Sequence, residues 1–115
     1  MSHLGTFVYG DTDKAVEWTL RNRTSGALID LTSATNAKVY ARRVGARAIV
    51  MDGVNATTGG AAGTFSFVPG AQSALAPGDK GKKSLFEIWG EYDLGGTHRT
   101  VPDDGPDVIE VVDLR

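Results

Sequence analysis

Short segments in which apolar and polar residues alternate run through this sequence, and they restrict it to a β-sheet fold. The alternation is strongest over residues 14–22, where Val16, Trp18 and Leu20 alternate with polar side chains. Successive side chains of a strand point to opposite faces, so this pattern predicts one buried face and one face in solvent. No segment keeps a helical period over roughly ten residues or more, which disfavours a parallel α/β fold.

Further segments carry strand signals, which gives about seven strands in all. Turn residues separate them about every 8–12 residues, the spacing expected of a β-sandwich. A chain of 115 residues is long enough for one domain and too short for two, so we expect a single domain over residues 1–115. The other predicted strands cover residues 37–44, 48–51, 64–68, 84–94, 97–101 and 108–114.

Alternation within the strands also predicts which side chains are buried. Along residues 37–44, for example, Val39 faces the core and Tyr40 faces outward. We expect Trp18 and Phe86 to lie on the facing inner surfaces of two sheets. The predicted core contains Val16, Trp18, Leu20, Ala37, Val39, Ala41, Phe65, Phe67, Phe86, Ile88 and Tyr92.

Turns and loops are predicted between the strands. Asp52 and Gly53 signal a turn. The small residues at 56–63 indicate a flexible loop. Leu28 and Leu31 belong to a short apolar segment that we expect to cover one end of the core.

Charge and composition exclude several classes of partner. The 14 acidic and 12 basic residues give a net charge of −2, whereas a general nucleic-acid binder carries a basic excess on one face. Without cysteine there is no disulfide framework, thiolate zinc site or thiol nucleophile. No apolar run approaches the roughly 20 residues of a membrane-spanning helix, and the N-terminus lacks signal-peptide features. We therefore expect no nucleic-acid or membrane partner, and a protein made in a cytoplasm that stays there until it is assembled or released.

Residues with catalytic chemistry are not grouped in a pattern typical of an enzyme. His3 and His98 are separated by most of the chain, and a zinc site without cysteine needs carboxylate ligands beside them. No serine lies in a strand–turn–helix elbow. The glycines within residues 59–63 lack the following lysine and helix of a phosphate loop. We expect neither catalytic residues nor a cofactor.

Three aspartates, Asp103, Asp104 and Asp107, lie close together around Gly105 and Pro106. Carboxylates at this spacing suit calcium, which takes about six to eight oxygen ligands. Aspartates are also common in solvated turns, where they bond to local backbone groups. We interpret the segment as a solvated turn before the last strand and expect no metal site.

Arginines and aromatic residues on outer strand faces are candidates for contacts. The only basic concentration lies around Arg42, Arg43 and Arg47. Arginine suits carboxylates and phosphates, and we favour a contact with another subunit over nucleic acid. Trp89 lies on the strand face opposite Phe86, so it is either packed under a loop or exposed together with Tyr40 as a contact surface. Exposed aromatic residues anchor protein interfaces and also form sugar-binding platforms, so both alternatives stay open.

The order of several short motifs resembles a known family. Gly-Asp-Thr at residues 10–12 precedes the first alternating strand, and Ile-Asp-Leu-Thr follows the next turn at residues 29–32. Phe-Glu-Ile-Trp at residues 86–89 and Arg-Thr-Val-Pro at residues 99–102 come later. Over roughly residues 10–114 the chain resembles the immunoglobulin-like domain at the N-terminus of bacteriophage baseplate upper proteins, and small free-standing phage proteins built on that domain.

The resemblance implies a fold and a function. The implied fold is all-β, an immunoglobulin-like β-sandwich of about seven antiparallel strands, with residues 1–9 as an N-terminal edge segment. The implied function is that of a non-enzymatic structural protein of the virion, at the tail tip or baseplate, in contact with other virion proteins in symmetric multiple copies. Longer baseplate proteins continue into fibre or receptor-facing regions, whereas this chain stops at Arg115, so we expect only the anchoring domain.

Two alternatives stay open beside this hypothesis. In the first alternative the protein decorates the capsid surface. In the second it is a carbohydrate-binding module with a host-surface glycan as its ligand. For a virion protein, we expect contacts with neighbouring subunits to come from sheet edges and outer faces. The predicted contact residues are Leu4, Phe7, Tyr40, Arg42, Arg43 and Trp89.

Overall fold

The structure is a computed structural model, and it describes residues 2–78 and 82–114. Its regular elements in these residues are nine strands and three short 3-10 helices, so the predicted all-β class is confirmed. The 3-10 helices are Gly60–Ala62, Pro69–Ala71 and Ser73–Leu75. The strands are β1 (His3–Val8), β2 (Val16–Thr19), β3 (Thr35–Arg43), β4 (Ile49–Asn55), β5 (Thr57–Thr58), β6 (Thr64–Phe67), β7 (Lys83–Leu94), β8 (Thr97–Val101) and β9 (Asp107–Val112).

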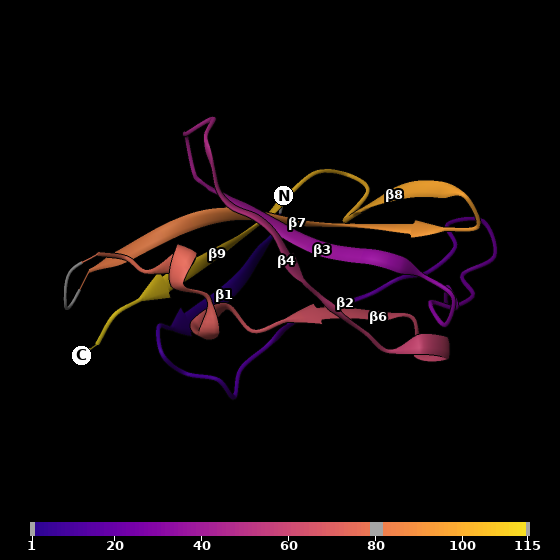
Figure 1. The fold of residues 1–115 in the computed structure, drawn as a ribbon, viewed down its shortest axis with the longest axis horizontal. Coiled ribbons are helices and arrows are strands. Elements are labelled where there is room, and N and C mark those ends of the chain that lie inside the picture. The colour runs from indigo at the N-terminus through magenta and orange to yellow at the C-terminus, as the bar shows by residue number, and fades with distance from the viewer. Residues whose placement is uncertain (1, 79–81, 115) are drawn as a thin grey trace.

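The larger of two sheets has six strands in the order β1-β9-β7-β3-β4, with β8 also paired to β7 (Figure 1). β7 is 12 residues long and organises this sheet. On one side its first half pairs with β9 and its second half with β8. β1 runs parallel to β9, so the prediction of a fully antiparallel fold is wrong at this edge. The reason is that both β1 and β9 run in the direction opposite to β7, from the middle of the sheet to the same end.

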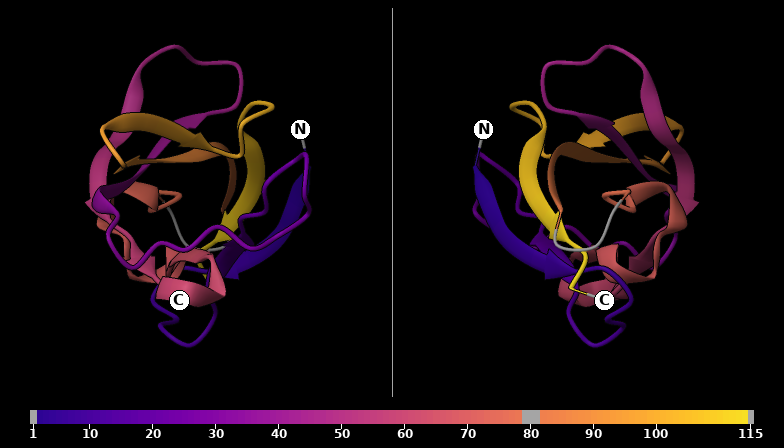
Figure 2. Two further views of the ribbon diagram at one scale, coloured as in Figure 1. Left: turned by 90° about the vertical axis from the view of Figure 1, so that its right-hand side faces the viewer. Right: turned by 90° about the vertical axis from the view of Figure 1, so that its left-hand side faces the viewer.

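The smaller sheet has three strands in the order β2-β6-β5. In its central pair, Val16 lies opposite Phe67 and Trp18 opposite Phe65. Seen along the long axis of the molecule, the strands of both sheets surround one central space, which the buried side chains fill (Figure 2). The core thus lies between the two sheets.

Most of the residues predicted to face the core are buried, whereas Leu20 and Ala37 are only partly buried and pack against it. Trp18 lies in the smaller sheet and Phe86 in the larger one, as predicted, and both belong to the same core cluster. Phe65 connects the two sheets, because its ring centroid lies 6.0 Å from those of both Trp18 and Tyr92. A Cβ atom at Gly90 would clash with the ring of Phe65, so this close approach requires glycine.

A bulge in β4 replaces a predicted turn. Asp52 and Gly53 do not reverse the chain but lie inside β4. The register between β3 and β4 shifts here, since Tyr40 pairs with Asp52 and Val39 with Val54. Gly53 is the extra residue, with a positive φ of 85° that favours glycine. The same Asp-Gly signal serves a turn and a bulge, so the local sequence does not distinguish them.

Two further local predictions are corrected. Residues 56–63 contain β5 and a 3-10 helix rather than a flexible loop, because neighbouring segments pair with their backbone. Leu31, for example, donates its N–H to the carbonyl of Gly60 at 2.9 Å. Leu31 is buried and covers one end of the core, but Leu28 is 43% exposed and does not.

A buried carboxylate connects β9 to the N-terminus and to the smaller sheet. Asp107 is only 7% exposed, so the prediction of a solvated turn is wrong for this residue. Its Oδ2 accepts a hydrogen bond from Trp18 Nε1 at 2.9 Å, and its Oδ1 accepts one from the backbone N–H of Ser2 at 3.0 Å. Ser2 in turn accepts a hydrogen bond from the N–H of Val108 at 2.7 Å. Asp107 is therefore a structural residue.

Replacement of Trp18 by alanine removes a large aromatic side chain from between the sheets. We expect the Trp18→Ala variant to lose about 3–5 kcal/mol of unfolding free energy. Glu17→Ala, which changes the exposed neighbour on β2, should lose far less. Denaturant titration of both variants measures the difference, and equal midpoints would contradict the placement of Trp18 in the core.

Replacement of Asp107 by alanine leaves the indole N–H of Trp18 without its buried acceptor. We expect Asp107→Ala to destabilise the protein by about 1–3 kcal/mol. The exposed Asp104→Ala is the matched control from the same segment and should unfold like the wild type. If the two variants had the same melting temperature, the buried carboxylate would contribute nothing to the fold.

Candidate functional site

Tyr40 and Trp89 lie together on the outer face of the larger sheet. They are directly opposite each other on β3 and β7, and their rings stack with centroids 5.8 Å apart and planes 14° from parallel. The bulge at Gly53 lies under Tyr40, where a Cβ would come to 3.5 Å from the tyrosine ring. Burial, followed by the charge of Glu91, raises the pKa of Tyr40. Both aromatic side chains are half-buried rather than fully exposed.

Arg42 and two glutamates complete this outer-face cluster. Arg42 Nε donates to Glu87 at 2.7 Å, and the arginine's guanidinium lies over the indole of Trp89, 5.4 Å from the ring centroid. The indole N–H donates to Glu91 at 3.1 Å. Trp89 therefore has partners for its ring and for its N–H within the protein. It offers less free surface to a sugar ring than an isolated exposed tryptophan would.

His98 lies between two carboxylates on the hairpin that joins β7 and β8. Its Nδ1 is 2.7 Å from Asp93 and its Nε2 is 2.8 Å from Glu91. Ionised carboxylates only accept hydrogen bonds, so His98 donates to both of them at once only in its protonated, imidazolium form. The hydrogen bond to Asp93, followed by the one to Glu91, raises the pKa of His98. Hydrogen bonds from Asn36 and then His98 lower the pKa of Asp93.

This arrangement was not predicted from the sequence, where His98 was interpreted as an isolated histidine. Gly95 and Gly96 form the turn between β7 and β8. A two-residue turn fixes the register of the hairpin and places Asp93 directly opposite His98. In a hairpin with a two-residue turn, the second residue before the turn lies opposite the second residue after it. This rule pairs Asp93 with His98 from the sequence alone.

The hairpin between β3 and β4 projects from the body of the molecule (Figures 1 and 2). Its apolar side chains are exposed: Val44 at 46%, Ile49 at 47% and Val50 at 38%. Leu85 on β7, 43% exposed, lies beside its base, where its carbonyl accepts a hydrogen bond from the N–H of Val44 at 3.1 Å. Exposed apolar side chains grouped along a projecting hairpin are typical of a contact surface.

Basic side chains flank this hairpin surface. Arg43 donates to the hydroxyl of Ser84 at 2.8 Å and lies over the ring of Phe86, 5.2 Å from its centroid. Arg47 is exposed in the turn itself. A hollow of about 520 Å³ lies at the base of the hairpin and includes Arg43, Val44, Lys83 and Leu85 in its lining. Glu110 also lines the hollow, 4.0 Å from Lys83, so the surface is apolar with a mainly basic border.

The six predicted contact residues do not form one surface. Tyr40, Arg42 and Trp89 lie in the outer-face cluster, and Arg43 lies at the base of the hairpin. On β1, Leu4 is partly buried against the core. Phe7 is only 2% exposed and belongs to the core, so it is not accessible to a partner while β1 stays in the sheet. Residues 1–9 were predicted to form an edge segment. Apolar and polar residues do not alternate clearly in this segment, so the sequence does not indicate which side chains of β1 face the core.

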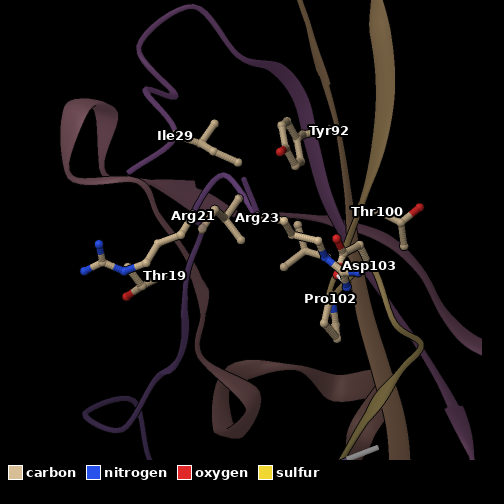
Figure 3. Close-up of a pocket in the computed structure, with 10 residues that line it drawn as sticks. Thr19, Arg21, Arg23, Ile29, Tyr92, Thr100, Pro102 and Asp103 are labelled. Carbon is tan, nitrogen blue, oxygen red and sulfur yellow. Dashed lines mark hydrogen bonds and ion pairs between the residues drawn. The ribbon is translucent and has the colours of Figure 1, made fainter. Parts of the chain in front are cut away.

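A cavity of about 290 Å³ lies at one end of the sandwich, between the larger sheet and the segment that follows β2 (Figure 3). Arg23 extends across it and pairs with Asp103 at 2.7 Å, whereas Arg21 points away. Because Asp103 pairs with Arg23 and Asp107 with Trp18, the three aspartates of this segment do not converge. Within the described residues, no group of three or more histidine, aspartate or glutamate side chains is arranged to hold a metal ion.

Comparisons with known proteins found no matching family model, no matching curated protein and no matching solved structure. None of the helices in the described part of the chain has the length and apolar character needed to cross a bilayer. Function is therefore inferred from the surfaces of the chain and from the sequence resemblance.

The pairing of His98 predicts a pH dependence. Because pairing raises the pKa in the folded state, it stabilises the fold fully below the unfolded pKa of about 6.5. This stabilisation is lost as the pH rises through the higher folded pKa. In an NMR titration we expect His98 to titrate at higher pH in the folded protein than in the denatured one. Asp93→Asn should lower the folded value and Asp13→Asn should not; an unchanged value in Asp93→Asn would contradict the pairing.

Proposed function

We propose that this chain is a non-enzymatic structural protein of a bacteriophage virion, which docks onto neighbouring subunits at the tail tip or baseplate. The observation that carries the proposal is the projecting β3–β4 hairpin with its exposed Val44, Ile49 and Val50. The sequence resemblance supplies the location. Neither the outer-face cluster nor the end cavity brings together the acid, base and nucleophile that a hydrolase needs.

The proposal includes an immunoglobulin-like arrangement of the sheets. In the variable-type immunoglobulin sandwich, strands G, F, C and C′ are neighbours in one sheet, and B, E and D lie in the other. The orders β9-β7-β3-β4 and β2-β6-β5 follow the same succession along the chain. β8, which lies between β7 and β9 in the sequence, departs from that pattern. The strand orders support an immunoglobulin-like topology with one added strand.

The hairpin is suited to contacts between subunits of a symmetric particle. Burial of aliphatic side chains contributes roughly 25 cal/mol per Å² of apolar surface removed from water. One hairpin offers only a few such side chains, so a single contact is weak. Copies arranged around a symmetric particle engage together, which raises the overall affinity without any new contact. Isolated chains in solution are then expected to associate little.

A capsid decoration protein would use the same hairpin, so the alternatives within this class differ in location only. A carbohydrate-binding module is the alternative from another class. The outer-face cluster supports it less, because Trp89 already stacks with Tyr40 and lies under Arg42. The protein contact is the better supported use of this surface.

Electron microscopy of the bacteriophage particle that carries this chain tests the proposal. We expect symmetric copies of the chain at the tail tip or baseplate, with the β3–β4 hairpin packed on a neighbouring subunit. Density on the capsid shell instead would favour decoration. A chain absent from the particle that binds one oligosaccharide tightly would favour the carbohydrate module.

A matched pair of variants tests the hairpin itself. Val44→Glu places a charge on the hairpin, and Leu28→Glu places the same charge on a comparably exposed residue at 43%. We expect particles produced with Val44→Glu to lose the protein and particles produced with Leu28→Glu to keep it. Equal incorporation of the two variants would show that the hairpin is not the contact.

A further inference from the structure

The β8 strand leaves one edge of the larger sheet open. β9 and β8 lie end to end along the same side of β7, because both pair antiparallel with it, over residues 83–88 and 90–94 of β7 respectively. β1 covers the far edge of β9. No strand in the described residues pairs with the far edge of β8. A strand added beside β8 would therefore lie end to end with β1, and no described strand occupies this position.

The register of the hairpin shows which backbone groups of β8 face this edge. In an antiparallel ladder, alternate residues direct their N–H and C=O to the partner strand, and the others direct them away. Thr97 pairs with Leu94 at the two-residue turn and faces β7. By alternation, His98 and Thr100 direct their backbone groups outward. These are the groups that an added strand would bind.

Hollows flank this edge on both faces of the sheet. The end cavity lies on the inner face, where Leu20, Ile29 and Tyr92 provide its apolar lining and Arg23 extends across it to Asp103 (Figure 3). A second hollow, of about 330 Å³, lies on the outer face against Trp89 and Pro106. Both are also lined by Thr100, Pro102 and Asp103, at the end of β8. An added strand directs successive side chains to opposite faces, so neighbouring side chains would enter the two hollows in turn.

The charge of β8 disfavours a second copy of this chain as the added strand. Arg99 lies at the middle of β8, is exposed, and forms no ion pair within the described residues. Two β8 strands paired antiparallel about their centres would place Arg99 close to its own copy, and like charges at that distance are destabilising. An acidic side chain on a different strand would instead pair with Arg99.

We propose that the β8 edge binds an extended segment of a partner protein, added as a further strand. The segment carries an acidic residue for Arg99 and two successive apolar side chains for the inner cavity and the outer hollow. This site is separate from the β3–β4 hairpin and does not depend on the virion function. The open edge requires an extended segment, the two hollows accept its apolar side chains, and Arg99 pairs with its acidic residue.

Selection from a random library of displayed peptides of roughly ten residues, long enough for one strand, tests this site on the whole protein. We expect the selected peptides to be acidic and apolar and to bind saturably. In proton–nitrogen correlation spectra they should shift the amides of His98, Thr100 and the residues of the end cavity. Selection of no saturable binder, or binders that shift the hairpin instead, would overturn the proposal.

Two variants of one residue isolate the backbone pairing. Thr100→Pro removes an outward N–H that the β7–β8 ladder does not use, which proline tolerates at a sheet edge. Thr100→Val removes the hydroxyl but keeps the N–H. We expect Thr100→Pro to weaken the selected peptides by about tenfold or more and Thr100→Val to bind nearly as well as the wild type. Equal binding by the two variants would exclude strand addition.

A charge reversal provides a test that does not depend on the proline variant folding. Arg99→Glu should weaken the acidic peptides and strengthen versions in which lysine replaces their acidic residue. Unchanged affinity for both versions would rule out the pairing with Arg99. Val44→Glu, on the hairpin, should bind the peptides like the wild type, so a failure of this site and a failure of the hairpin contact are distinguished.

Discussion

The buried Asp107 carboxylate is the interaction on which the arrangement of the larger sheet depends. Burial of a carboxyl group is costly unless hydrogen bonds within the protein replace those that it made with water. Trp18 from the smaller sheet and the backbone of Ser2 supply those bonds. The same residue begins β9. One side chain thus joins the start of β9 to the N-terminal end of β1 and to the second sheet. β9 pairs with residues 83–88 of β7, and β8 pairs with residues 90–94 on the same side.

The sequence predicts the interior of this fold well because alternation is a local property. The residues expected inside β2, β6 and β7 are buried, and in β3 only Ala37 is partly exposed. Predictions failed where a distant partner decides the structure. Gly53 forms a bulge because Tyr40 and Val39 on β3 set the register, and residues 57–58 form a strand because β6 lies beside them. Nothing near Asp107 in the sequence indicates that an indole from β2 will meet it.

Candidate surfaces were predicted only in part, for the same reason. Alternation placed Tyr40 and Trp89 on outer faces, but only the register between β3 and β7 brings them into contact. Phe7 was expected to be a contact and is in the core, because the parallel pairing with β9 turns it inward. The hollows beside β8 combine residues from β2, β7 and the segment after β8, and no local pattern connects these segments.

The parallel pairing of β1 with β9 has a mechanical consequence. Tension that enters the chain ahead of β1 and leaves it after β9 pulls the two strands along their length in opposite directions. The ladder is then sheared, and its hydrogen bonds share the load instead of opening one after another from an end. The bonds of Asp107 to Ser2 and Trp18 lie at the end where the pull on β1 arrives. When force is applied through these two strands, all the hydrogen bonds between β1 and β9 resist extension together.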